Sequence, residues 1–178
     1  MSEMPVRDIQ LPTPGQTVGP FFRYGLEFEG SELLVAPDST GAVRLYGRVL
    51  DGAGEPVPDA LIEIWQTDAS GAIPTAEGSL HRSDAFTGWG RVHSGDDGGY
   101  AFTTVEPGTG FFAVVVFARG LLDRLHTRIY LPEQPDDALL ATLDAEERAT
   151  LVARRTPHGL EHDIRLQGEL ETVFLAFG

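Results

Sequence analysis

Apolar and polar residues alternate along much of the chain after residue 41, and this period of two predicts short β-strands. The alternation is clearest over 43–49, and it recurs over 60–66, 100–105 and 125–131. The segment 111–117, FFAVVVF, is apolar at every position, which is typical of a central strand covered on both faces. Glycine-rich turns separate several of these segments, so the pattern indicates a protein built mainly of β-strands.

One helix is predicted late in the chain. Asp144 is a candidate N-cap, and Glu147, three residues later, completes the capping-box pattern. Leucines at positions 139, 140, 143 and 151 would give this region an apolar side. Two further strands are expected over 160–167 and 172–177, which would close the fold.

The first 20 residues are predicted to form an extended arm, because their prolines favour polyproline-like or turn geometry. We expect residues 1–40 to be an N-terminal arm and interface segment, and residues 41–178 to form one β-sandwich domain. Phe21 and Phe22 are expected at an interface or in the core. The predicted fold class is all-β: a prealbumin-like β-sandwich with an extended N-terminal arm and a short helical region before the C-terminal strands.

Composition and charge narrow the classes of function. At 42% hydrophobic, a chain of 178 residues can bury a proper core, and both Trp65 and Trp89 are expected in it. The absence of cysteine excludes disulfides, thiolate metal sites and a cysteine nucleophile. A net charge of −14 argues against nucleic acid and anionic membranes as partners, since both reward clustered Lys and Arg. With no long apolar stretch, a cytoplasmic protein is expected.

The most patterned stretch, 45–66, is a strand, a glycine turn and a second strand entered through prolines. This pattern alone is a signal of fold, because prealbumin-like sandwiches without any chemistry also carry it. A non-catalytic binding or structural sandwich is therefore the alternative to an enzyme, and the motifs that follow distinguish the two.

Two later motifs, FTGWGR at 86–91 and DGGYAFTTVEPG at 97–108, resemble the intradiol ring-cleaving dioxygenases. In that family a ferric ion binds a catecholate, and the ring opens between its two hydroxyls. The arm TPGQTVGP at 13–20, and FARGLL and HTRIY within 117–130, are similar to the α-subunit branch, as is DIRLQGE at 163–169. Enzymes of this branch act on protocatechuate and O₂ in the β-ketoadipate pathway. The resemblance implies an α/β heteromer in which this chain is inactive alone.

The resemblance also implies where iron ligands would stand, and this chain lacks them. Family members that bind iron use two tyrosines and two histidines. The place of the first tyrosine holds Ile73, and the His-x-His pair is replaced by Phe111 and Ala113. The second tyrosine is missing from the short loop 109–110. We therefore expect no metal ligand and no catalytic residue here, and Fe(III) bound instead by a homologous β subunit.

By motif position, the resemblance makes Thr17, Gly19 and Arg119 the residues that line the shared cavity and contact substrate, with Pro20 shaping the turn. Protocatechuate carries a carboxylate, for which an arginine offers a forked set of donors and a fixed positive charge. The alternatives are that Thr17 and Gly19 serve only as turn residues, and that Arg119 pairs with Asp123 or another acidic group.

Overall fold

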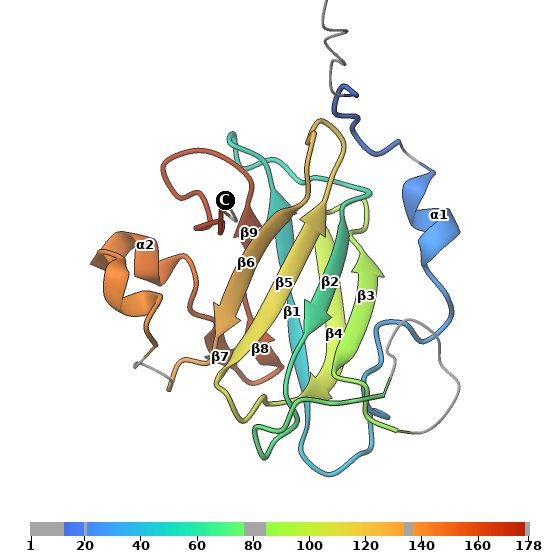
Figure 1. Ribbon diagram of the computed structural model, residues 1–178, viewed down its shortest axis with the longest axis vertical. Helices are drawn as coiled ribbons and strands as arrows, with labels where there is room; N and C mark the ends of the chain where they lie inside the picture. The colour runs from blue at the N-terminus through green and yellow to red at the C-terminus, as the bar shows by residue number, and fades with distance from the viewer. Residues whose placement is uncertain (1–12, 20, 77–84, 134–136, 177–178) are drawn as a thin grey trace, which may run out of the picture.

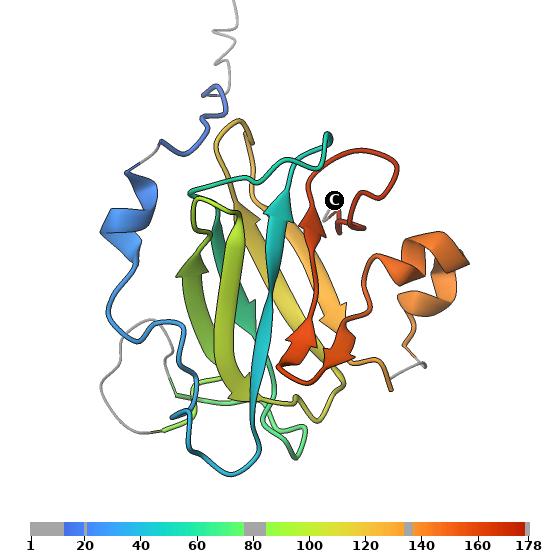
Figure 2. The same ribbon diagram turned by 180° about the vertical axis from the view of Figure 1, so that it is seen from behind.

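Two β-sheets pack face to face in the computed structural model, which describes residues 13–19, 21–76, 85–133 and 137–176 (Figures 1 and 2). The first sheet has the order β4-β1-β8-β7, with β9 pairing further along β1, and the second has the order β3-β2-β5-β6. In chain order the elements are α1 (Phe22–Leu26), β1 (Ala42–Leu50), β2 (Leu61–Trp65), β3 (Trp89–His93), β4 (Gly99–Val105), β5 (Phe111–Phe117), β6 (Leu125–Tyr130), the 3₁₀ turn η1 (Leu140–Thr142), α2 (Ala145–Ala149), β7 (Arg154–Thr156), β8 (Gly159–Glu161) and β9 (Ile164–Arg165).

The core lies between the sheets and is built from the alternate positions of their strands. Leu45 and Phe102 face inward from the first sheet, and Ile62, Phe112 and Ile129 face inward from the second, all almost fully buried. Burying an aliphatic or phenyl side chain stabilises the fold by about 1.5–3 kcal/mol. The all-β sandwich predicted from the hydrophobic pattern is thus confirmed.

The five strands predicted from residues 43–131 are confirmed, with ends that differ by a few residues at most. β5 pairs with β2 on one side and β6 on the other, as expected of a central strand. Its outer face is covered only in part, however, because Phe111, Ala113 and Phe117 are half-buried. Trp65 was wrongly expected in the core. It ends β2 on this same outer face and is 41% exposed, whereas Trp89 is buried and stacks on Phe28.

The two strands predicted at the C-terminus need correction. The expected strand 160–167 is divided into β8 and β9, because the carboxylate of Asp163 accepts a hydrogen bond from the Arg48 amide at 2.9 Å and interrupts the pairing with β1. The expected strand 172–177 forms no strand over 172–176, the part that the structure describes. Its amides bond to separate partners, Thr172 to the Arg165 carbonyl and Leu175 to that of His126, so no continuous ladder develops.

The predicted helix and its cap are confirmed. The Asp144 carboxylate accepts from the amides of Glu146 and Glu147, and the Glu147 carboxylate accepts from the Asp144 amide at 3.0 Å. The helix has only five residues, and it is anchored by the neighbouring leucines rather than by its own buried face. Leu140 and Leu151 pack on Tyr130 of β6 in a small second core.

The N-terminal segment crosses the second sheet on its β3 side, where α1 stands beside the strand edge (Figures 1 and 2). Residues 13–19 form neither helix nor strand, while residues 1–12 and Pro20 lie outside the described residues. The Arg91 guanidinium binds the Leu26 carbonyl at 2.6 Å and the Glu63 carboxylate, which ties the end of α1 to β3 and β2. In the described part of the chain, no helix has the length and apolarity needed to cross a membrane.

Candidate functional site at the N-terminal arm

The described part of the arm lies on the turn that follows β5. Gly120 in this turn has a φ of 92°, a conformation that glycine adopts without strain. Its amide donates a hydrogen bond of 2.6 Å to the Thr17 hydroxyl. A Cβ added at Gly15 would lie 3.5 Å from the Leu122 side chain, so arm and turn are in contact at a second point. Thr17 is thereby held against Gly120, the residue that follows Arg119 in the chain.

Gly19 occupies a different position from Thr17. Its carbonyl accepts a hydrogen bond from the Phe22 amide at 3.1 Å, just before α1. A Cβ added at Gly19 would meet no atom within 4 Å, so packing within the described chain does not require glycine here. The structure thus gives Gly19 open space on its surface, and it shows no contact between Gly19 and Arg119.

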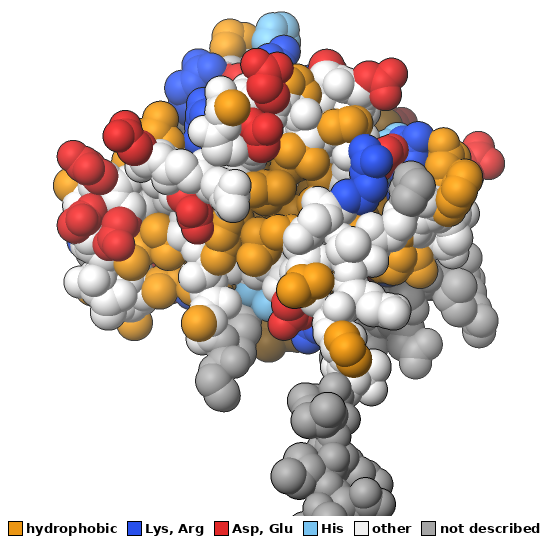
Figure 3. Space-filling view, turned by 90° about the horizontal axis from the view of Figure 1, so that it is seen from above, with side chains coloured by type: hydrophobic (Ala, Val, Ile, Leu, Met, Phe, Trp, Pro, Cys, Tyr) orange, Lys and Arg blue, Asp and Glu red, His pale blue; other side chains and the backbone are white. Residues whose placement is uncertain are grey.

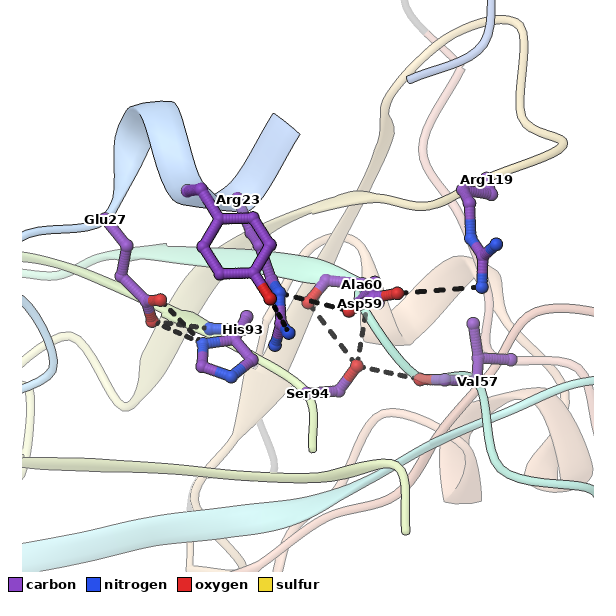
Figure 4. Close-up of polar contacts among 9 residues, drawn as sticks. Arg23, Glu27, Val57, Asp59, Ala60, His93, Ser94 and Arg119 are labelled. Carbon is purple, nitrogen blue, oxygen red and sulfur yellow. Dashed lines mark hydrogen bonds and ion pairs between the residues drawn. The ribbon is translucent and has the colours of Figure 1, made fainter. Parts of the chain in front are cut away.

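Arg119 projects from the same turn and is half exposed (Figure 4). One of its terminal nitrogens lies 3.6 Å from a carboxylate oxygen of Asp59, while the other oxygen of that carboxylate lies 3.1 Å from Nε of Arg23 on α1. The sequence left open that Arg119 pairs with Asp123 or another acidic group. The partner is another acidic group, Asp59, while Asp123 is paired with Arg124. Three residues from distant parts of the chain therefore form one chain of charges, Arg23–Asp59–Arg119.

Asp59 is placed by the turn that enters β2. With a φ of 65°, it is the one non-glycine residue with positive φ in the described part of the chain. Its amide donates to the Ser94 carbonyl at 3.2 Å. The buried Ser94 hydroxyl donates to the Val57 carbonyl at 2.7 Å and accepts from the Ala60 amide at 2.9 Å, which fixes the turn from both sides (Figure 4). Asp59 is thus held in an uncommon conformation by well-satisfied neighbours.

A second pair fixes the exit of α1. Both carboxylate oxygens of Glu27 approach Nδ1 of His93, the closer at 2.6 Å, and one also accepts from the His93 amide. This contact and the Arg91–Leu26 hydrogen bond hold the end of α1 independently of Arg23. Arg23 is therefore not the sole anchor of the helix.

The surface around this cluster is shallow. A hollow of about 200 Å³ lies between the arm and the end of β5, with Val18, Phe22 and Leu121 in its wall. Seen from this end of the sandwich, hydrophobic side chains gather in the middle, and acidic ones are spread around the rim (Figure 3). Larger grooves lie elsewhere, including one of about 720 Å³ over the outer face of β1. The hollow is smaller than the ~300–1,000 Å³ typical of pockets for drug-sized ligands.

The opposite end of β5 holds the positions where the resemblance places iron ligands. Ile73 is exposed, Phe111 packs against Tyr130 at a ring distance of 5.6 Å, and Ala113 pairs with Trp65 and Arg128 of the neighbouring strands. Among the described residues, no group of three His, Cys, Asp or Glu side chains is placed to hold a metal ion. The donor set therefore does not fit a ferric ion in this part of the chain.

An ion-pair cluster stands beside these positions instead. The Arg128 guanidinium lies over the Phe111 ring at 4.2 Å and pairs with Asp137 at 3.2 Å. The Tyr130 hydroxyl donates to the same carboxylate at 2.7 Å. Burial raises the pKa of Tyr130 to about 12, so the phenol stays protonated. The Tyr130 hydroxyl is therefore committed to the Asp137 carboxylate within this cluster.

The sequence singled out three residues of this candidate site and missed two others. Thr17 and the Arg119–Gly120 turn are brought together, and Gly19 lies at the arm's end. Asp59 and Arg23 were not identified, although an aspartate directly after Pro58 marked a turn. Neither pattern nor spacing indicated that the two would meet Arg119.

Comparisons with known proteins point to one family. A family model described as "Dioxygenase" matches residues 19–133. The chain is 38% identical to the protocatechuate 3,4-dioxygenase alpha chain of Burkholderia cepacia, with 91% of this chain and 95% of the relative covered. It is 29% identical to the beta chain of the same organism's enzyme, over 71% and 64% of the two chains. The dioxygenase domain of a carbohydrate-binding fusion from Streptomyces sp. SirexAA-E superposes with a TM-score of 0.54 and 26% identity, covering 86% of this chain and 96% of that one.

Proposed function

Because the chain belongs to the intradiol ring-cleaving dioxygenase family, we propose that it is the non-metal-binding α subunit of a protocatechuate 3,4-dioxygenase. In this role it completes, together with a homologous β subunit, the cavity in which both atoms of O₂ are inserted into protocatechuate to give 3-carboxy-cis,cis-muconate. The proposal rests above all on one observation: a half-exposed arginine stands beside an N-terminal arm, in a chain whose described residues offer no metal site.

Arg119 has the chemistry to recognise the carboxylate of the substrate. A guanidinium presents parallel N–H donors that match the two oxygens of a carboxylate, and its charge does not titrate. Asp59, its partner in the free chain, is engaged at 3.6 Å, a separation at which an ion pair is weak and readily exchanged. A substrate carboxylate can therefore replace this contact when the cavity is closed by the β subunit.

The arm gives this arginine its setting. Because Thr17 accepts from the Gly120 amide, the arm and the turn that carries Arg119 act as one surface. The open space beside Gly19 allows another backbone or a substrate ring to approach closely. Thr17 and Gly19 are accordingly proposed to line the shared cavity.

The ferric ion is assigned to the β subunit, since this chain lacks suitable donors at the positions of the family ligands. What this chain does in the reaction is to bind, orient and select. It holds the carboxylated ring by Arg119 and closes one wall of the cavity. Plain catechol, which lacks the carboxylate, gains nothing from Arg119 and should be the poorer substrate.

Co-expression with an iron-bearing β chain tests the proposal directly. We expect a stable α/β complex that contains ferric iron and consumes O₂ in the presence of protocatechuate. The same β chain expressed alone serves as the control and should be less active or less selective for protocatechuate over catechol. A lone monomer that never associates with the β chain would contradict the proposal, as would stoichiometric ferric iron in the purified single chain.

A further inference from the structure

We infer that Arg23 on α1 is a positioning residue for the substrate carboxylate, and that it acts through Asp59 by keeping Arg119 available. This inference rests on the proposed function and deepens it. It concerns why Arg119 can bind an external carboxylate although an aspartate of the same chain stands beside it.

The three side chains have unequal distances and exposures. Arg23 lies 3.1 Å from one oxygen of Asp59, whereas Arg119 lies 3.6 Å from the other. Arg23 and Asp59 are mostly buried, at 20% and 23% exposed, while Arg119 is 50% exposed. Nε of Arg23 makes no hydrogen bond to the described residues, so its contact with Asp59 is purely one of charge. As a charge contact, the closer and better shielded pair is the stronger one, because screening by water weakens exposed pairs. Asp59 therefore belongs chiefly to Arg23.

The charges of the three side chains explain why Arg119 can still attract an external carboxylate. Arg23, Asp59 and Arg119 together carry a net charge of one positive unit, and the exposed end of the series is the Arg119 guanidinium. Without Arg23, Asp59 and Arg119 would sum to zero and would pair only with each other. An incoming carboxylate would then compete with Asp59 for Arg119 and meet the repulsion of an aspartate that is no longer neutralised.

The fold keeps this arrangement in place without help from Arg23. The turn of Asp59 is fixed by Ser94, and the end of α1 is held by Glu27–His93 and Arg91–Leu26. Arg23 also donates to the Tyr24 hydroxyl at 2.7 Å, but Tyr24 is exposed. Loss of the Arg23 charge should thus alter the electrostatics at Arg119 more than it alters the structure.

The test uses the α/β complex and four variants of this chain: R23Q, R23K, D59N and the double variant R23Q/D59N. Asparagine is tolerated at positive φ, so D59N removes charge without new backbone strain. In R23Q the KM for protocatechuate should rise about threefold to tenfold, with kcat nearly unchanged. Turnover of catechol should not change, and R23K should restore most of the wild-type KM.

The double variant gives the decisive result. If Arg23 acts by neutralising Asp59, its loss has no cost once Asp59 is uncharged, so R23Q/D59N should have the same KM as D59N. A purely structural role for Arg23 predicts instead that R23Q raises the KM equally in both backgrounds and that it harms catechol turnover as well. Either of these outcomes would overturn the inference.

The variant R119A separates this inference from the proposed function. If R119A raises the KM for protocatechuate but R23Q does not, the inference is wrong and the proposed function stands. If R119A itself leaves the KM and the preference over catechol unchanged, the role of Arg119 and the inference fail together.

Discussion

The two ends of strand β5 have opposite characters, although seven residues of one strand join them. At its beginning lie Phe111 and Ala113, the positions at which the sequence resemblance implies histidines in iron-binding relatives. Arg128, Tyr130 and Asp137 contact one another beside them. Beyond its end, the Arg119 side chain is half exposed, and it shares the Asp59 carboxylate with Arg23. At the first end the charged and polar groups are paired with one another, whereas at the second the Arg119 guanidinium is exposed to solvent.

Under the proposed function, this difference explains how a subunit without a metal site can take part in catalysis. At the first end, an ion pair and a cation–π contact of Arg128 stabilise the strand. Where the arm meets the turn, Thr17 is hydrogen-bonded to Gly120, but half of the Arg119 side chain is still exposed to solvent. Substitutions at the first end should therefore change the stability of the fold, while those at the second should change turnover of the complex.

Arg119→Ala should have the largest effect on turnover. If the guanidinium meets the substrate carboxylate, its removal should raise the KM for protocatechuate by about tenfold to a few hundredfold. The thermal stability of the complex should stay close to that of wild type, because the side chain is half exposed. Steady-state O₂ consumption measures the effect. Unchanged kinetics would show that Arg119 has no role in binding.

Deletion of residues 1–20 should come next. Without Thr17 the arm can no longer hold the Arg119 turn, and kcat/KM of the complex should fall by about tenfold or more, since misplaced binding groups are costly. The sandwich itself should still fold, because the core clusters of the described residues contain none of residues 13–19. Full activity together with a native circular-dichroism spectrum would show that the arm is not part of the cavity.

Thr17→Val should have a smaller effect of the same kind. Valine has nearly the same shape but cannot accept from the Gly120 amide. We expect a loss in kcat/KM of about twofold to fivefold, the worth of one partly exposed hydrogen bond. Thr40→Val is a matched control at another exposed threonine and should leave the kinetics unchanged. Equal results for the two variants would break the assignment of Thr17.

Asp137→Ala should have the smallest effect on turnover and a clear effect on stability. It leaves the Tyr130 hydroxyl and Arg128 without their carboxylate, at a cost of about 1–3 kcal/mol in the free energy of unfolding. Asp38→Ala, at an exposed aspartate, is the control and should change that free energy by less than about 0.5 kcal/mol. A fall in kcat/KM of the folded Asp137 variant would erase the contrast between the two ends of β5.

Prediction from the sequence was reliable where burial repeats at short range. β1, β2, β4 and β6 follow from alternation and β5 from its continuous apolar run, while the helix cap follows from Asp144 and Glu147. β3 was not predicted, because glycine and arginine in WGRVH obscure its alternation. The late strands were misjudged, since a side chain, Asp163, takes the place of a backbone partner. Trp65 was misplaced because its hydrophobicity does not reveal which face of a sheet is covered.

By itself, the sequence determined the sandwich, because the hydrophobic pattern depends on the type of residue at each point of a strand. It also singled out Thr17, Gly19 and Arg119, through motifs that belong to a family. Only the tertiary structure decided that Arg119 shares Asp59 with Arg23. These three residues lie on a helix and two separate turns, and they meet because β2 pairs with both β3 and β5 and so brings those turns to one end of the sheet. Ion pairs of this kind depend on where distant turns come to lie, which no local periodicity encodes.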